Sequence, residues 1–126
     1  MALRVLLVDD NRHFLEAARD LLEREGVDVV GTASTSAETL RLVEQLQPNV
    51  VLVDIDLGAE SGFDLASRLA AVTDACICLI SAYSEAEFAD LIAASPADGF
   101  VPKAELSAEA ISNLLGEGDR GRGRAN

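Results

Sequence analysis

Three apolar runs in this chain of 126 residues end in side chains that can do chemistry. The first run leads into Asp9 and Asp10, the second ends at Asp54, and the third ends at Ser81. Short runs rich in Val, Ile and Leu between polar residues are typical of strands buried on both faces of a parallel sheet. Because ligands bind beyond the carboxyl ends of such strands, we expect these side chains to meet at one edge of a sheet.

The carboxylates of Asp9, Asp10 and Asp54 predict a cation site if they converge at that edge. Unpaired carboxylates that lie close together repel and raise one another's pKa values. A hard divalent ion relieves this repulsion, and Mg²⁺ is the usual ion where a few carboxylates act together with a phosphate. Lys103 is the only lysine in the chain, and it follows a further predicted strand, where it adds a compact positive charge.

A carboxylate nucleophile, a magnesium ion, an ammonium group and a hydroxyl together suit phosphoryl transfer onto an aspartate. Asp54 is the predicted nucleophile, because the most apolar strand, Val50–Asp54, presents it between the other groups. Each residue alone has a simpler explanation, as a helix cap, a turn hydroxyl or a surface charge. Their joint occurrence at several strand ends favours the chemical interpretation.

Strand and helix patterns alternate along the chain. Strands are expected over 3–8, 27–33, 50–54, 75–81 and 98–102, and helices around 14–22, over 36–47, around 63–72, around 84–94 and over 108–115. Parallel neighbours need crossover connections, so this order predicts an α/β fold, a doubly wound parallel sheet with helices on both faces. We expect one domain over 1–115 and a flexible tail rich in Gly and Arg over 116–126.

The composition limits the partners and the compartment. The formal net charge of −12 disfavours contact with nucleic acid or an anionic membrane, and favours proteins or cations as partners. The sequence shows no signal peptide and no apolar stretch of membrane length, so we expect a cytoplasmic protein. Cys76 and Cys78 lie on one face of one predicted strand, as core residues of a reducing compartment.

Four segments in this order make the chain resemble the receiver domains of two-component response regulators. They are Leu-Val-Asp-Asp-Asn (7–11), Val-Asp-Ile-Asp-Leu-Gly-Ala-Glu-Ser-Gly (53–62), Ile-Ser-Ala (80–82) and Asp-Gly-Phe-Val-Pro-Lys (98–103). The resemblance covers Leu3 to about Leu115. It implies a flavodoxin-like (βα)5 sheet with strand order 2-1-3-4-5. It also implies a cytoplasmic phosphoprotein of a phosphorelay, which is not an enzyme although it assists its own phosphorylation and dephosphorylation.

The resemblance also implies a role for each site residue. Asp54 would become 4-aspartylphosphate, with a histidine kinase or a phosphotransfer protein as the donor. Mg²⁺ would bind through Asp9 or Asp10, through Asp54 and through the backbone carbonyl of Asp56. Lys103 would pair with the phosphoryl group.

A conformational switch follows from the same resemblance. Ser81 would move to bind the phosphoryl group while the aromatic side chain of Phe100 turns inward, and the face of the fourth helix, fifth strand and fifth helix would repack. That face is the family's usual dimer surface. Phe100 can also be a plain core aromatic, since it has no hydroxyl to favour either position. We hypothesise that Asp56 and Tyr83 set the lifetime of the phosphoryl group.

Two departures from the family pattern are visible. Gly58 stands where the family usually has proline, which predicts a more mobile loop. Ala104 replaces the proline that commonly follows the lysine, while Pro102 precedes it, a variant similar to receivers joined to helix-turn-helix output domains.

Two other functions remain open from the sequence. The fold could serve as an interaction module that does not depend on phosphorylation. The segment Val50–Leu57 also fits the opening of haloacid-dehalogenase-like phosphatases, with Asp54 as nucleophile and Asp56 as general acid. The phosphatase interpretation leaves Asp9 and Asp10 unexplained.

Overall fold

The computed structural model describes residues 3–121, which fold around one five-stranded parallel sheet. The strands are β1 Arg4–Val8, β2 Asp28–Ala33, β3 Val50–Asp54, β6 Cys76–Ser81 and β7 Gly99–Pro102. Their order is β2-β1-β3-β6-β7, and every neighbouring pair is parallel. This order is the predicted 2-1-3-4-5 arrangement of a flavodoxin-like fold, so the fold prediction is confirmed.

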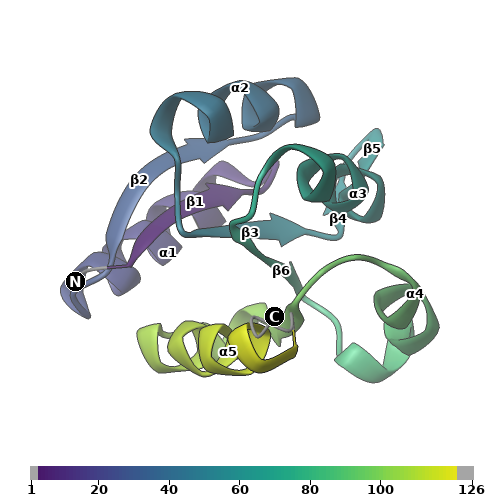
Figure 1. Cartoon of the computed structure of the whole chain (residues 1–126). Coiled ribbons are helices and arrows are strands. Elements are labelled where there is room, and N and C mark those ends of the chain that lie inside the picture. Colours follow the sequence, from purple (N-terminus) through teal and green to yellow (C-terminus); the bar gives the residue numbers. More distant parts are fainter. Residues whose placement is uncertain (1–2, 122–126) are drawn as a thin grey trace.

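Helices cover both faces of the sheet (Figure 1). They are α1 Arg12–Arg24, α2 Ser36–Leu46, α3 Gly62–Val72, α4 Ala89–Ala94 and α5 Ala108–Gly121, together with the 3₁₀ helices η1 Glu85–Phe88 and η2 Lys103–Glu105. A two-stranded antiparallel hairpin, β4 Asp56–Leu57 with β5 Glu60–Ser61, follows β3. The sequence pattern does not predict this hairpin.

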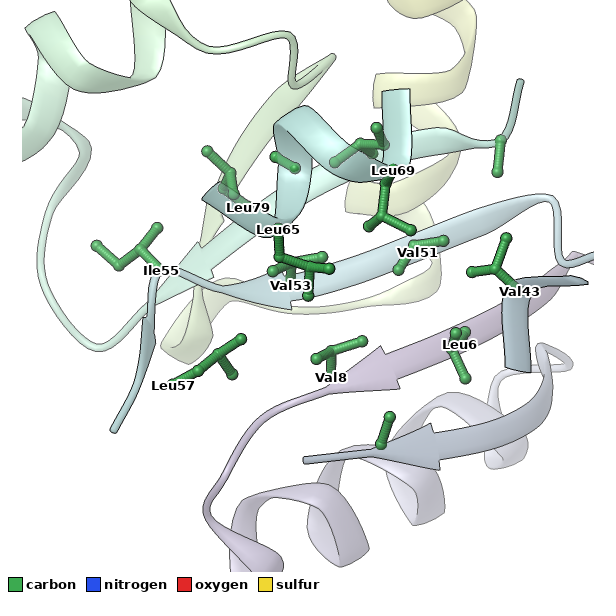
Figure 2. Packing of buried hydrophobic residues seen from close by; sticks show 14 of the residues in the cluster. Leu6, Val8, Val43, Val51, Val53, Ile55, Leu57, Leu65, Leu69 and Leu79 are labelled. Atoms are coloured by element: carbon green, nitrogen blue, oxygen red, sulfur yellow. The ribbon is translucent and has the colours of Figure 1, made fainter. Parts of the chain in front are cut away.

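The core has two layers because the sheet is buried on both faces. On one face, side chains of β1, β3 and β6 pack against α2 and α3, as Figure 2 shows for Leu6, Val53 and Leu65. On the other face, the same strands pack against α1 and α5, and Cys76 and Cys78 both lie in this second layer as predicted. Burial of a few dozen apolar side chains at about 1.5–3 kcal/mol each is the main stabilising term.

Polar side chains fix where three of the helices begin. Asn11 Oδ1 accepts a hydrogen bond of 3.2 Å from Phe14 N at the start of α1. Thr35 Oγ1 does the same for Glu38 N in α2, and Ser61 Oγ for Phe63 N in α3, both at 3.1 Å. Such caps fix the helix starts at the carboxyl edge of the sheet, next to the candidate site.

Two helices differ from the sequence prediction. The helix expected around 84–94 is split into η1 and α4, and none of the residues in either is buried. Helix α5 continues to Gly121, past the predicted end at Leu115, because glycine weakens a helix but, unlike proline, keeps its backbone hydrogen bond. The flexible tail over 116–126 stays a prediction, since residues 122–126 lie outside the described part of the chain. Within residues 3–121, no helix has the length and apolar character that a membrane crossing requires.

Candidate functional site

Three carboxylates meet at the carboxyl edge of the sheet. Strands β1 and β3 pair with Val8 opposite Val53, so the residues that follow, Asp9 and Asp54, lie side by side. One ligand oxygen each from Asp9, Asp10 and Asp54 can be chosen such that all three lie within 4.8 Å of one another. Asp9 is fully buried and Asp54 is 6% exposed, whereas Asp10 faces solvent.

Lys103 reaches two of these carboxylates from the end of β7. Its Nζ atom lies 2.6 Å from Asp9 Oδ2 and 3.2 Å from Asp54 Oδ2. The same Nζ atom lies 4.4 Å from the centre of the Phe14 ring, a favourable position for a cation over an aromatic face. Burial lowers the pKa of Lys103, but the hydrogen bond and charge of Asp9 and the charge of Asp54 raise it more, so the side chain stays protonated.

The environment of Asp54 disfavours its ionised form. Burial is the largest cause, the charge of Asp9 adds to it, and together they raise the pKa of Asp54 to about 6. The backbone N–H of Asp56, which donates to Asp54 Oδ1 at 3.1 Å, and the ammonium of Lys103 oppose this shift without cancelling it. A cation bound among the carboxylates would remove most of the penalty.

The donor atoms present fit a hard cation. Asp9 Oδ1 accepts a hydrogen bond of 2.9 Å from Asn11 N, while the buried Asp9 Oδ2 has the ammonium of Lys103 as its partner among the described residues. Such a buried oxygen beside two further carboxylates is the kind of donor that a divalent ion takes. The cluster of Asp9, Asp10 and Asp54 could therefore hold a metal ion.

Ser81 and Tyr83 form the side of the site next to β6. Ser81 is buried, and its Oγ accepts a hydrogen bond of 3.0 Å from Tyr83 N. The Tyr83 side chain is 59% exposed, and its ring lies 6.2 Å from that of Phe88, which in turn lies 6.4 Å from the Phe63 ring. Phe100 lies in the core, a position that both of its predicted roles allow.

The hairpin after β3 forms another side of the site, and it explains the glycine at position 58. Leu57 pairs with Glu60, so Gly58 and Ala59 form a two-residue turn with positive φ at its first position. Glycine at that position is typical of type II′ turns. Gly58 has φ of 74°, which proline cannot adopt. The hairpin thus gives the loop a defined conformation, and the added mobility stays a prediction.

The structure brings four of the predicted site residues together at one edge, and sequence reasoning missed two contacts there. Asp9, Asp10, Asp54 and Lys103 are brought together directly. The ring of Phe14 over Lys103 and the carboxylate of Glu60 next to α2 were not singled out. A glycine at the turn position was the one available signal for the hairpin that carries Glu60.

Comparison with known proteins identifies the class. The pattern of the family described as "Response regulator receiver domain" matches residues 5–115, and the chain belongs to this family. It is a receiver domain of the two-component response regulator type, a signalling domain.

Individual relatives agree with this assignment. The chain is 31% identical over 109 residues to a protein of Pseudomonas aeruginosa described as a transcriptional regulator, covering 86% of this chain and 53% of that protein. It is 37% identical over 84 residues to a response regulatory protein of Vibrio cholerae, covering 66% and 35%. The chain therefore spans about half or less of the length of these relatives.

A solved structure has the same fold over the whole chain. The signal receiver domain of a modulated diguanylate cyclase from Desulfovibrio desulfuricans matches with a TM-score of 0.81 and 28% identity, covering 100% of both chains. These matches give no support to the phosphatase interpretation of Val50–Leu57.

Proposed function

We propose that this domain accepts a phosphoryl group on Asp54 from a histidine kinase or a phosphotransfer protein, with Mg²⁺ as cofactor. The observation that carries the proposal is the placement of Asp54 between a buried partner carboxylate and the ammonium of Lys103, 3.2 Å away. A carboxylate held in this way has a neighbouring cation to neutralise the charge that it gains.

The chemistry is a phosphoryl transfer between two side chains. A carboxylate oxygen of Asp54 attacks the phosphorus of the donor phosphohistidine, the P–N bond breaks with its electron pair leaving to the imidazole, and a mixed anhydride forms on Asp54. Lys103 balances the charge of the transferred group. Mg²⁺, held by Asp9, Asp10 and Asp54 with the backbone carbonyl of Asp56, would neutralise further charge on the phosphoryl oxygens.

The protonation state of Asp54 suits this reaction at neutral pH. With a pKa of about 6, the carboxyl group is mostly ionised at about pH 7.5, and the bound cation increases the ionised fraction. The domain then acts as a phosphoacceptor that assists the gain and loss of its own phosphoryl group, and it turns over no small substrate.

The response to phosphorylation begins at Ser81. Its hydroxyl would leave the N–H of Tyr83 and donate to a phosphoryl oxygen, which would move the segment that leads into η1. The side chain of Phe100, in the core next to η1, would turn inward and stabilise the new position of that segment. The repacked face of α4, β7 and α5 is the proposed surface for a second copy or another protein, and no nucleic acid or membrane is contacted by this domain itself.

A stable phosphoryl mimic tests the proposal. We would add Mg²⁺ and beryllofluoride to the purified protein and record backbone amide spectra, with Asp54→Asn as the control. Amide shifts at Ser81, Phe100 and Lys103 that are absent from the control are the expected result. Unchanged spectra in both proteins would overturn the proposal and leave an interaction module that does not depend on phosphorylation.

Two further residues beside the site concern the lifetime of the phosphoryl group on Asp54. We propose that Asp56 and Tyr83 tune the hydrolysis of the phosphoryl group, because Asp56 adds negative charge beside the path of an attacking water. Equal dephosphorylation rates in Asp56→Asn and the parent protein would exclude Asp56 from this role.

A further inference from the structure

Glu60 links the hairpin beside the acceptor site to the start of α2. Its Oε1 atom accepts a hydrogen bond of 2.8 Å from the backbone N–H of Ser36, 24 residues earlier in the chain. Ser36 is the first residue of α2, and the first N–H groups of a helix have no partner within the helix. The carboxylate satisfies one of these groups and lies at the positive end of the helix dipole.

The hairpin carries this connection on to the acceptor carboxylate. Leu57 pairs with Glu60, and Asp56 pairs with Ser61, so the two short strands move together. The N–H of Asp56 donates to Asp54 Oδ1 at 3.1 Å. The hydrogen bond that Glu60 accepts from Ser36 N–H therefore connects α2 directly to the hairpin that orients the Asp54 carboxylate.

The turn of the hairpin also lies against the third carboxylate. A Cβ atom at Gly58 would lie 3.0 Å from Asp10 Oδ2, tighter than nine in ten real Cβ contacts. The N–H of Gly58 donates to Asp56 Oδ1 at 3.1 Å, which closes the turn. A shift of the hairpin would therefore change its spacing to both Asp54 and Asp10.

We propose that Glu60 is a positioning residue for cation and phosphoryl binding at this site. It holds the hairpin against α2 and so keeps the Asp56 backbone at a fixed place beside Asp54. This inference rests on the proposed function, since it concerns the same site. Without the bond to Ser36 N, the backbone of Asp56 gains freedom that cation binding must then remove.

Glu38 is a matched control for Glu60. Its Oε1 atom accepts a hydrogen bond of 2.9 Å from Ser34 N, just before the same helix, but the bond is local and reaches no part of the hairpin. Replacing either residue by alanine removes one negative charge and one acceptor of a backbone N–H near the start of α2. The two variants differ in whether the hairpin loses its tether.

The experiment compares four proteins: the parent, Glu60→Ala, Glu60→Gln and Glu38→Ala. For each, the Kd for Mg²⁺ is measured from amide shifts, and the half-life of the phosphoryl group is measured after loading with acetyl phosphate. We expect Glu60→Ala to bind Mg²⁺ about five-fold more weakly, the loss that corresponds to one ordinary hydrogen bond, and to lose its phosphoryl group faster. Glu60→Gln keeps the acceptor oxygen, and it should stay within about two-fold of the parent.

Amide exchange in the parent protein gives a second test that needs no variant. If the tether couples α2 to the site, Mg²⁺ binding must slow hydrogen exchange at Ser36 N–H, because coupling between two sites is reciprocal. The N–H of Ser34, held by Glu38, should not respond. This measurement decides the inference even if Glu60→Ala fails to fold.

The outcomes separate the inference from the proposed function. Equal Mg²⁺ affinity and phosphoryl half-life in Glu60→Ala and Glu38→Ala would overturn the role of Glu60. So would an equal exchange response at Ser34 and Ser36. A parent protein that neither binds Mg²⁺ nor accepts a phosphoryl group would instead contradict the proposed function itself.

Discussion

Two segments follow adjacent strands at the site, and they are held in different ways. The hairpin after β3 has Leu57 buried in the core and Ile55 N bonded to Ile80 O at 3.0 Å, and Glu60 joins it to α2. The segment 83–95 after β6 contains no buried residue, and Tyr83 and Leu91 are 59% and 54% exposed. The hairpin begins two residues after Asp54, and the segment 83–95 begins two residues after Ser81.

The difference indicates a site with one fixed side and one adjustable side. Segments with few buried contacts open at a lower free energy than the core, and elements that move in signalling are drawn from them. The fixed hairpin holds the Asp54 carboxylate, whereas the adjustable segment can change position at little energetic cost. A receiver needs both, because the chemistry requires a constant geometry and the signal requires a change.

Gly62→Ala should have the largest effect, because it breaks the fixed side. Gly62 begins α3 where the hairpin ends, and a methyl group there would collide with the backbone oxygen of Asp54 and lie 2.6 Å from Ile55 Cα. Backbone atoms cannot yield as a flexible side chain can, so we expect a loss of at least about 3 kcal/mol in the free energy of unfolding. Urea unfolding measures it.

Gly26→Ala is the control for this substitution. Gly26 has φ of 89° with nothing within 4 Å of its Cβ position, so alanine there meets conformational strain without a collision and should lose about 1 kcal/mol. Equal losses in the two variants would show that the hairpin side can relax.

Lys103→Met should have the next largest effect, and Mg²⁺ should reduce it. Removing the ammonium leaves two close carboxylates, Asp9 and Asp54, without their cation, for a loss of about 2–3 kcal/mol in the presence of EDTA. A divalent ion among the carboxylates replaces the missing charge, so the loss should shrink in saturating Mg²⁺. Arg41→Met, which removes an exposed cation, should change stability by less than about 0.5 kcal/mol in either buffer. A loss at Lys103 that Mg²⁺ leaves unchanged would contradict the cation site.

The parts of this site that the sequence predicts are those with a local pattern. An apolar run that ends in a carboxylate places Asp9 and Asp54 at strand ends, and the parallel order of the strands then brings them together. The single lysine at the end of another strand is predicted in the same way. Such features depend on periodicity and strand order, which the chain displays residue by residue.

The parts that the sequence does not predict depend on contacts between distant segments. The spacing of Phe14 on its helix predicts a core residue and gives no sign of the contact with Lys103. The bond from Glu60 to Ser36 spans 24 residues and leaves no periodic trace. The split near Phe88 arises because the segment has few large apolar residues and buries none of them, so little packing holds it as one continuous helix.

Asp54→Asn should stabilise the protein at neutral pH, by an amount smaller than the loss expected for Lys103→Met. The pKa of Asp54 is about 6 in the folded state against an ordinary value of 3.8, so the folded state binds this proton more tightly than the unfolded chain. Stability then falls as pH rises between these two values, and above about pH 6 the ionised carboxylate destabilises the fold. The asparagine variant lacks this loss and should gain about 1–2 kcal/mol at about pH 7.5 in EDTA.

The pH profile gives the decisive comparison for Asp54. Near pH 4 the parent carboxyl is protonated when folded, so the difference between the parent and Asp54→Asn should be close to zero there. Saturating Mg²⁺ should reverse the advantage of the variant at neutral pH, because the ion binds the parent carboxylate. A constant difference at all pH values would indicate a change in packing and not in ionisation.

Phe88→Ala should have the smallest effect on stability, because it acts on the adjustable side. The Phe88 side chain is only half-buried and packs between the rings of Phe63 and Tyr83, so we expect a loss of about 1 kcal/mol. The same substitution should have a larger effect on how the segment responds to a phosphoryl mimic. Tyr83 is the only tyrosine in a chain without tryptophan, so its fluorescence reports on this segment alone.

The fluorescence of Tyr83 can therefore show whether the adjustable side responds to the fixed one. Beryllofluoride with Mg²⁺ should change the emission in the parent protein, because Ser81 Oγ, which now accepts from Tyr83 N, turns toward the phosphoryl mimic. In Phe88→Ala this change should be reduced, since the ring that couples Tyr83 to Phe63 is gone. Leu91→Ala, an exposed side chain of the same segment, should keep the full change. A full change in Phe88→Ala as well would mean that Tyr83 moves with Ser81 alone, and the aromatic contacts would then be packing without a part in the switch.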